Sequence, residues 1–411
     1  MPLFFVAYAI AFGGYVLAIG TGEGRSLRTV IGWGLVFRAT LLLSEPSLSG
    51  DIYRYLWDGL VQLDGINPYQ FAPSAGELSL VQRPDILARV NHPDLYTIYP
   101  PFAQLFFRVC ATIAPEVWTI KAGVCLWDCL TVMFLVGLAR SYDIHPGAVA
   151  LYFWNPLVIV EGAGHGHIDL VGVSLLVVAL LYIRVHGYGR AAAALALAGL
   201  TKFVPVLMFP SMWRWAAQAE ANGKSLMVAM FTTRAVVLPV VFIAVFVAGY
   251  VPFSDVGWSA SGSLHAYATT WEFNAPVYGL LRGLGLDGNS ARLVLAVCLV
   301  LAISAISVSR MPPIQAAYYV IGVFLFLTPT LHPWYVVWVV PFLCFYGNRG
   351  WIALSGLIVL AYQVLIRYHA TGVWEEETWV RWVIFFSAAA VWFAPGVAAL
   401  VRTRVWGTPE R

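Results

Sequence analysis

The stretch SGDIYRYLWDGLVQLDGINPYQF, Ser49 to Phe71, is polar and aromatic, and it directly follows a hydrophobic run. Read as a helix, it places polar side chains at i, i+3, i+4 and i+7 on one face. These are Asp51, Arg54, Tyr55 and Asp58. A second face carries Ile52, Leu56 and Leu63. Such an amphipathic helix is typical of a membrane surface. The stretch therefore predicts a surface helix with its apolar face on lipid or protein and its charged side toward a cavity.

The composition of the whole chain is that of an integral membrane protein. Of its 411 residues, 60% are hydrophobic and 11% are charged, whereas about a quarter of the residues in soluble domains are charged. Apolar runs recur from end to end, each near the ~20 residues that a helix needs to cross a bilayer. The sequence predicts one all-α domain over residues 1–411, a polytopic transmembrane bundle of about 11 to 13 helices.

Hydropathy predicts where the spans lie. They are expected near residues 3–20, 28–43, 117–139, 147–161, 168–185, 227–250, 291–309, 314–330, 334–346, 351–368 and 380–401. Segment 100–114 is short for a span, and Thr201, Lys202 and Pro205 interrupt segment 191–216. We therefore expect some half-length or re-entrant helices. The first twenty residues lack a basic n-region and a cleavage site, so they are expected to be a retained span.

Charge predicts the orientation of the bundle, because basic residues mark the cytoplasmic side. The basic set is Arg25, Arg28, Arg140, Arg184, Arg190, Arg214, Lys224, Arg310, Arg349, Arg402 and Arg404. Opposite to it, loop 44–99 is acidic and loop 252–275 has no Lys or Arg. We expect both loops, and the cluster Glu375 to Glu377, to face outward. The five cysteines all lie in apolar runs, so no disulfide framework is expected.

Asp51 is the first candidate for chemistry. It follows Gly50 at the expected start of the helix, where the helix dipole favours a carboxylate that can accept a proton from a sugar hydroxyl. The alternative is a capping Asp paired with Arg54. Further along the loop, Gly65 to Tyr69, which includes Asn67, is a turn pattern that ends the helix. His92 and Asp94 precede the return to the membrane, where they would bind an acceptor or shape the loop.

A second cluster lies in NPLVIVEGAGHGHID, at the end of one predicted span and the start of the next. It contains Asn155, Glu161, His165, His167 and Asp169. The His-x-His-x-Asp pattern is able to supply metal ligands. Its short spacing on a glycine-rich turn is a weak metal pattern, however, so binding of a sugar ring or orientation of other side chains is favoured.

Two cationic candidates lie at proline breaks in apolar runs. Lys202 has no acidic neighbour in sequence, and an unpaired buried lysine tends to lose its proton unless an anion such as a phosphate lies against it. Snorkelling to the cytoplasmic interface is the alternative. His332 begins a span beside Trp334 and Tyr335, two aromatic residues that also suit an interfacial belt.

These groups suit transfer of a sugar from a polyprenyl phosphate. Phosphate is already a good leaving group, so the reaction needs one base and cations that hold the departing anion. Asp51 would be the base, and Lys202 and His332 would contact the phosphate. No nucleotide fingerprint or Asp-x-Asp motif lies in the loops, and an outward site has no access to cytoplasmic nucleotide sugars. One displacement inverts the anomeric centre.

Several motifs resemble those of the GT-C superfamily of membrane glycosyltransferases, particularly bacterial family 87 enzymes, which include polyprenyl-phosphate-mannose-dependent mannosyltransferases. The matching elements are Asp51 to Tyr55 with Trp57 to Gly59, Gly65 to Tyr69, Tyr99 to Pro101, Glu161 with His167 and Asp169, Lys202 with Pro205, Trp271 with Asn274, and His332 to Tyr335. The resemblance implies a catalytic Asp51, a lipid-phosphate sugar donor with mannose favoured, no required metal or other cofactor, and a bacterial plasma membrane. Two departures are an apolar segment, 3–20, before the span that precedes the acidic loop, and the absence of an adjacent acidic pair.

The remaining candidates follow from this interpretation. The donor phosphate is expected to contact Lys202, His332 and Arg54. Sugar or acceptor is expected to contact Asp58, Tyr55, Asn67, Tyr69, His92, Asp94, Tyr99, Glu161, His167, Asp169, Trp271, Asn274 and Tyr335. The expected partners are the lipid-linked donor, a glycolipid or glycan acceptor and membrane lipids, with no nucleic acid.

Two other function classes compete with a glycosyltransferase. A transporter or lipid flippase would explain broken helices and a buried charge. The long polar loop between Ser44 and Ile98 disfavours it, because an alternating-access carrier does not need such a loop. A structural membrane scaffold leaves the acidic helix face and Lys202 unexplained.

Overall fold

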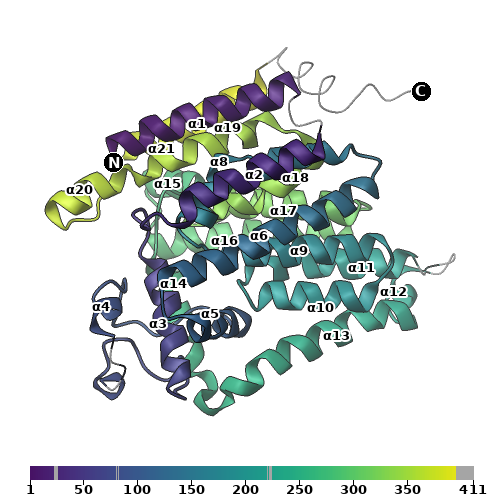
Figure 1. Cartoon of the computed structure of the whole chain (residues 1–411). Helices are drawn as coiled ribbons and strands as arrows, with labels where there is room; N and C mark the ends of the chain where they lie inside the picture. Colours follow the sequence, from purple (N-terminus) through teal and green to yellow (C-terminus); the bar gives the residue numbers. More distant parts are fainter. Residues whose placement is uncertain (23–25, 80, 82, 220, 222–224, 395–411) are drawn as a thin grey trace.

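The computed structural model describes residues 1–22, 26–79, 81, 83–219, 221 and 225–394 (Figure 1). Within these ranges the chain is helical and contains no β-strand; the one β-type contact is an isolated bridge between Phe273 and Thr330. The all-α expectation is therefore confirmed. Some residues of the sequence predictions lie outside the described ranges. They are Arg25, Lys224, Arg402 and Arg404 of the basic set, and residues 395–401 of the expected span 380–401.

Five described helical segments are long and apolar enough to cross a bilayer. They are α1 (Pro2–Thr21), α6 (Val117–Arg140), α13 (Thr233–Tyr250) with its continuation to Gly257, α16 (Gly288–Val308), and the run α19 (Arg349–Leu357), η8 (Ile358–Gln363) and α20 (Val364–Thr371). Shorter apolar helices complete the bundle. They include α5 (Pro101–Ile113), α17 (Pro313–Leu327), η7 (Pro333–Trp338) with α18 (Val340–Tyr346), and α21 (Thr378–Phe393). The helix α2 (Leu27–Leu42) follows α1. Multi-pass character is thus confirmed, and the count of 11 to 13 stays a prediction.

The span expected over residues 147–161 is not a single helix in the structure. Residues 147–161 fold into short pieces, η3 (Pro146–Val149), α7 (Ala150–Phe153) and α8 (Pro156–Ile159), followed by the π-helical turn η4 (Val160–Gly164). Pro156 has no backbone N–H, and the Asn155 side chain caps the next turn by accepting a hydrogen bond from the Leu157 N–H. The helix therefore stops and restarts at Asn155.

Two further breaks lie deep in the chain. The pair α8–η4 and α9 (Asp169–Arg184) bends by 120°. The break predicted within segment 191–216 is also present, between α10 (Tyr188–Gly199) and η5 (Val204–Met208), which leads into α11 (Phe209–Ala219). Lys202 lies in this second break and Asp169 begins α9, so interrupted helices bring polar groups into an apolar bundle, as in many membrane proteins.

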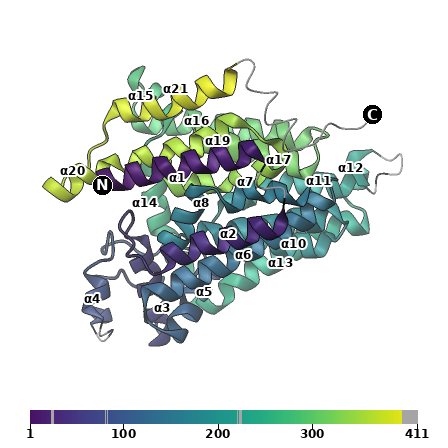
Figure 2. The same ribbon diagram turned by 45° about the horizontal axis from the view of Figure 1, so that its top comes forward.

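The elements of the acidic loops gather at one end of the molecule. Figures 1 and 2 both place α3 (Asp51–Leu63), α4 (Pro84–Leu87), α14 (Gly262–Thr270) and α20 at the left, and α11 and α12 (Leu226–Ala229) at the right. At the other end, Arg184 donates a hydrogen bond to the Ser141 carbonyl, and Arg214 donates to the Ser309 carbonyl. Two arginines of the basic set thus contact the ends of neighbouring helices, Arg184 that of α6 and Arg214 that of α16, which agrees with a two-sided charge distribution.

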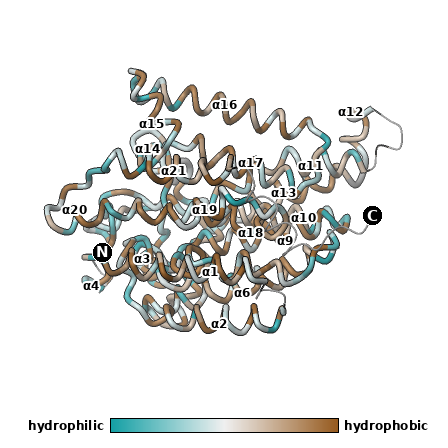
Figure 3. The backbone as a smooth tube through the Cα atoms, turned by 90° about the horizontal axis from the view of Figure 1, so that it is seen from above, coloured by the Kyte–Doolittle hydropathy of each residue, from teal (hydrophilic) through white to brown (hydrophobic). Residues whose placement is uncertain are grey.

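Helix α16 lies at the edge of the bundle. Figure 3 shows it as a largely hydrophobic tube set apart from the central helices. Only 17% of its most apolar 18-residue stretch is buried inside the protein. It packs on α17, α11 and the short helix α15 (Pro276–Gly283). The most apolar and least buried helices thus form the lipid-facing surface, and the interrupted helices lie inside.

Candidate active site

Helix α3 forms as predicted, from Asp51 to Leu63, but both of its faces are covered by protein. Ile52 and Leu56 are buried, and so are Arg54 and Asp58, which are 6% and 2% exposed. Gly59 faces α5 so closely that a Cβ atom would lie 2.5 Å from the Phe107 carbonyl oxygen. The expectation of a charged face open to a cavity is therefore wrong for the middle of the helix, because α5 packs against it.

Asp51 keeps access to solvent because it is the first residue of α3. Its backbone N–H donates to the Ser49 hydroxyl, and its Oδ1 accepts a 2.7 Å hydrogen bond from the Asn91 amide. The side chain is partly exposed. Arg54 is not its partner, since Arg54 pairs with Asp58. The capping alternative with Arg54 is therefore wrong, and a different residue, Asn91, orients the carboxylate.

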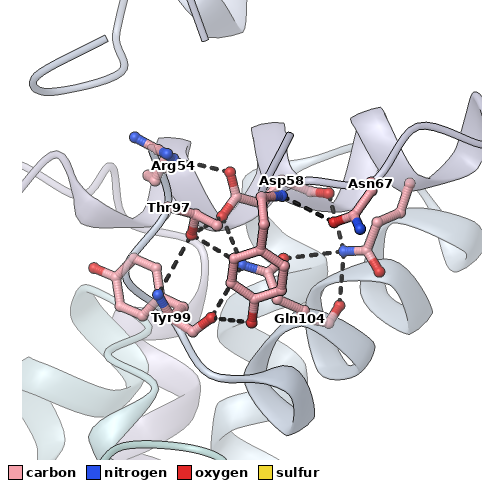
Figure 4. Close-up of polar contacts among 8 residues, drawn as sticks. Arg54, Asp58, Asn67, Thr97, Tyr99 and Gln104 are labelled. Atoms are coloured by element: carbon pink, nitrogen blue, oxygen red, sulfur yellow. Dashed lines mark hydrogen bonds and ion pairs between the residues drawn. The ribbon is translucent and has the colours of Figure 1, made fainter. Parts of the chain in front are cut away.

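Asp58 lies at the centre of a buried network (Figure 4). Its Oδ1 accepts a 2.8 Å bond from Arg54 Nε, and its Oδ2 accepts bonds from the Thr97 hydroxyl at 2.5 Å and from Gln104 at 2.9 Å. The Gln62 amide donates to the Asp58 carbonyl oxygen and to Gln104. With both oxygens engaged and little exposure, Asp58 joins α3, the 97–100 segment and α5. Its predicted contact with sugar stays a prediction.

Lys202 has an acidic partner that sequence proximity did not indicate. Its Nζ lies 2.8 Å from both carboxylate oxygens of Asp169, and Trp338 Nε1 donates to Asp169 Oδ1 at 2.7 Å. Asp169 is fully buried, whereas the Lys202 side chain is 19% exposed. The description of Lys202 as unpaired is therefore wrong. The buried Asp169 carboxylate thus compensates the charge of the Lys202 amine, and part of the Lys202 side chain stays accessible.

Two phenols connect this ion pair to the outer loops. Lys202 Nζ lies 4.5 Å from the ring centre of Tyr335, and the hydroxyls of Tyr335 and Tyr267 share a 2.5 Å hydrogen bond. Burial raises the pKa of Tyr267, the bond to Tyr335 opposes this, and the charges of Asp51 and Asp169 raise the pKa further. The Tyr267 hydroxyl on α14 therefore lies in the field of both carboxylates.

Tyr55 of α3 and Tyr99 at the end of the first outer loop also lie near Asp51. Their rings meet edge to face at 4.9 Å, and Tyr55 stacks on Phe107 at 4.6 Å. Burial raises the pKa of Tyr55, and the charges of Asp51 and then Asp169 add to the shift. Burial and then the Asp51 charge also raise the pKa of Tyr99. Phenols thus surround the region between Asp51 and the Lys202–Asp169 pair.

Aromatic rings stack into a column beside this region. His332 stacks on Trp334 at 4.3 Å with the rings 3° from parallel, and Trp334 stacks on His167 at 4.2 Å. Phe273 from the second outer loop packs on the other side of His332 at 4.9 Å. The column fixes the plane of His332 and leaves the edge of its ring for polar contacts. Its predicted phosphate contact stays a prediction.

His167, the last ring of the column, forms a buried pair with Glu161. Glu161 Oε2 lies 3.2 Å from His167 Nε2, and the Tyr362 hydroxyl donates to both carboxylate oxygens of Glu161. Both side chains of the pair are 0% exposed. Their position in and beside the π-helical turn suits residues that orient other side chains, since such turns often lie at functional sites. The sugar-binding role expected for them stays a prediction.

His165 has both ring nitrogens engaged with backbone. Nε2 accepts the Leu48 N–H at 3.1 Å, and Nδ1 lies 2.9 Å from the Val160 carbonyl oxygen. It therefore anchors the start of the first outer loop to η4. Among the residues that the structure describes, no three His, Cys, Asp or Glu side chains are placed to hold a metal ion.

The two outer loops contact each other through the other predicted residues. Asn67 donates to Asp255, the Tyr69 ring meets Phe253 edge to face at 5.3 Å, and the His92 ring meets Trp271 edge to face at 4.9 Å. Within the first loop, Tyr69 donates to the Tyr99 carbonyl and Asp94 accepts a bond from Ser74, and in the second loop the Asn274 N–H donates to Glu376. These residues shape the loops around the region near Asp51. Their expected contacts with sugar or acceptor stay predictions.

Sequence reasoning missed several residues that complete the site. They are Asn91, Thr97, Gln104, Tyr267 and Trp338. Asn91 directly precedes His92, which was already a candidate, and Tyr267 lies in the second outer loop, which has no Lys or Arg. The pairing of Trp338 with Asp169 joins residues 169 positions apart and had no local signal.

Comparison with known proteins gives the class to which this site belongs. A sequence model described as "Alpha-(1->6)-mannopyranosyltransferase, N-terminal domain" matches residues 3–218, more than half of the chain. The class is therefore that of membrane glycosyltransferases, and the chain belongs to the alpha-(1->6)-mannopyranosyltransferase family. The resemblance to mannosyltransferases inferred from the motifs is confirmed.

Individual relatives carry the same name. Alpha-(1->6)-mannopyranosyltransferase B of Corynebacterium glutamicum is 26% identical over 80% of this chain and 60% of its own length. Alpha-(1->6)-mannopyranosyltransferase A of Mycobacterium tuberculosis is 24% identical over 93% of this chain and 77% of its own length. The chain thus spans only three fifths of the first relative.

Among solved structures, ArnT from Cupriavidus metallidurans bound to undecaprenyl phosphate is 14% identical, with a TM-score of 0.47. The match covers 92% of this chain and 73% of that protein. A likeness at this level is too weak to carry an argument about the site.

Proposed function

We propose that the protein is a membrane mannosyltransferase that moves mannose from a polyprenyl-phosphate donor to a hydroxyl of a lipid-linked or glycan acceptor, at the outer face of a bacterial plasma membrane. Membership of the alpha-(1->6)-mannopyranosyltransferase family supports the sugar and the reaction class. The observation that carries the proposal is the arrangement of Asp51 and the Lys202–Asp169 pair around common phenols.

Asp51 is the general base in this proposal. A base must reach the proton that it removes, and Asp51 combines partial exposure with an Oδ1 held by Asn91. The start of α3 adds a favourable dipole for the carboxylate. Asp58 is unsuited to this work because Arg54, Thr97 and Gln104 already occupy its oxygens.

Lys202 supplies the cation for the leaving phosphate. Asp169, itself held by Trp338, fixes the amine in place, and the Lys202 side chain remains 19% exposed. His332, held in its ring column, would contact the phosphate through the edge of its ring. A preorganised positive charge stabilises the anion that develops as the glycosidic bond breaks.

The reaction balances with these groups alone. Asp51 takes the proton of the acceptor hydroxyl, and the acceptor oxygen forms a bond to the anomeric carbon. The bond from that carbon to the phosphate oxygen breaks, and its electron pair leaves with the polyprenyl phosphate. Attack from the face opposite the phosphate inverts the anomeric centre.

A donor comparison tests the proposal. The purified full chain in liposomes is given radiolabelled mannose as polyprenyl-phosphate mannose or as a nucleotide-linked mannose, with an alkyl mannoside as acceptor. We expect labelled product from the lipid donor only. Product from the nucleotide donor, or transport of the lipid donor without cleavage of its glycosidic bond, contradicts the proposal.

A further inference from the structure

A cavity lies between α1, α2 and the interrupted segment α8–η4, apart from the Lys202–Asp169 pair and the ring column. Its volume is about 800 Å³. Small residues of α1 at helical spacing form one wall, namely Ala7, Ala11, Gly14 and Ala18. The opposite walls are apolar, with Phe37 from α2 and Ile159 from α8. An elongated apolar space along a membrane-spanning helix has the form that an alkyl chain fills.

The wall at Gly14 is open rather than tightly packed. A Cβ atom built there has no heavy atom within 4 Å, and Gly14 is exposed. Small side chains on α1 therefore do not serve close contact between helices at this point, which is the usual reason for small residues in membrane helices. They keep space free.

Hydroxyl and carboxylate groups line one end of the cavity. Ser44, Glu45 and Ser47 lie in the short loop after α2, and all three are exposed. Of the described residues that line the cavity, none is Lys or Arg. Lys121 is nearby, but its Nζ already donates to the Leu41 and Ser44 carbonyl oxygens at 2.8 and 2.6 Å. This end offers acceptors and donors for sugar hydroxyls, and Arg89, a cation beside it, pairs with Glu45 at 3.6 Å.

The polar end is directly connected to the proposed base. Leu48 lines the cavity, and its N–H is bound to His165, which also lines it. Asp51 follows three residues later as the start of α3. A molecule with its chain in the cavity therefore presents its head group close to the segment that carries Asp51. The cavity has no lining residue in common with the Lys202, Asp169 and His332 region.

We infer that this cavity, which we call the α1–α2 groove, binds the alkyl chain of a glycolipid acceptor and delivers its sugar hydroxyl to Asp51. The inference rests on the proposed function. It gives the two lipids separate approaches: the acceptor enters beside α1, and the donor phosphate lies against Lys202, which does not line the groove.

Filling the groove tests the inference. The variant Gly14→Phe places a large side chain in free space, so the fold has no packed atoms to displace. The matched control is Gly13→Phe, the neighbouring exposed glycine of the same helix, which has equally open surroundings and does not line the groove. Ala11→Phe is a second filling variant at another lining position.

Transfer from polyprenyl-phosphate mannose is measured with two acceptors, octadecyl mannoside and methyl mannoside. For Gly14→Phe and Ala11→Phe we expect KM for octadecyl mannoside to rise at least about tenfold, a difference of about 1.4 kcal/mol in binding, because the phenyl ring takes the space that the alkyl chain would fill. Transfer to methyl mannoside and KM for the donor stay as in Gly13→Phe. A rise in the donor KM instead, or equal losses with both acceptors, overturns the inference.

A binding readout separates this inference from the proposed function. Octadecyl mannoside with a photoreactive group in its chain is expected to crosslink to α1 in Gly13→Phe and far less in Gly14→Phe. A phospholipid with the same chain that crosslinks equally well shows that the groove holds bulk lipid and contradicts the inference. If crosslinking follows the expectation but the wild-type protein transfers no mannose, the acceptor groove stands and the proposed donor reaction falls.

Discussion

Asp169 shows what a single buried carboxylate contributes to this protein. It is fully buried, it binds Lys202 through both oxygens, and it accepts a hydrogen bond from Trp338. A charge inside a membrane protein is costly unless it is paired, so such residues usually mark functional regions. Here one carboxylate joins the start of α9, the break after α10 and the helix η7, and it holds the amine that we assign to the donor phosphate.

Removing one charge of the Lys202–Asp169 pair should lower the stability of the protein more than removing both charges. Lys202→Met leaves Asp169 buried without a cation, and we expect a loss of about 3–5 kcal/mol of stability. The double variant with Asp169→Asn removes both charges and should recover most of the melting temperature, but not the activity. Thermal unfolding in detergent measures the three proteins. A Lys202→Met protein as stable as the wild type would show that the pair is not coupled in the folded state.

At the scale of elements, the contact between α3 and α5 sets the geometry around Asp51. Gly59 lets the two helices approach until a Cβ atom would touch the Phe107 carbonyl, and the Asp58 network joins them at the same level. The rigid lower part of α3 thus supports the partly exposed Asp51 at its start. A precise site in a loop region is possible because a buried helix carries it.

Gly59→Ala should therefore separate the two helices. We expect a loss of about 1–3 kcal/mol from overpacking, together with lower transfer activity, because the Asp58 network must shift. Gly76→Ala is the control in the same loop, since a Cβ atom there meets no atom within 4 Å. Melting temperature and transfer rate are the measurements. Equal behaviour of the two variants would refute the role of close helix approach.

The elements that sequence analysis predicted well are those with local signals. The polar pattern of Asp51 to Asp58 predicted the start of α3, and Thr201 to Pro205 predicted the break after α10. The enclosure of Asp58 was not predictable, because Thr97 and Gln104 come from distant positions. Likewise, no local pattern indicates that Lys202 finds its counter-ion 33 residues away.

For the whole molecule, the account requires a fixed orientation across the membrane. Elements of the acidic loops gather at one end in Figures 1 and 2. Arg184 and Arg214, two members of the basic set, bind the carbonyls of Ser141 and Ser309, which follow α6 and α16. Because basic loops are retained in the cytoplasm, the end with α3 and α14 should face outward. That side offers lipid-linked sugars and excludes cytoplasmic nucleotide sugars.

Cysteine labelling tests this orientation. Glu77→Cys lies in the first outer loop and Arg140→Cys at the end of α6, and both positions are exposed. We expect a membrane-impermeant maleimide added to intact cells to label Glu77→Cys at once and Arg140→Cys only after permeabilisation. The unmodified protein, with its five native cysteines, is the background control. The reverse pattern would place Asp51 on the cytoplasmic side and contradict the proposed donor.

The most direct measurement for the central claim is the turnover of Asp51→Asn with polyprenyl-phosphate mannose, taken together with donor affinity in the same preparation. Asn keeps the shape of the side chain and its contact with Asn91, but it cannot accept the proton. We predict that turnover falls by ~10²–10⁴ while donor affinity and melting temperature remain those of the wild type. Turnover within a few fold of the wild type would contradict the account.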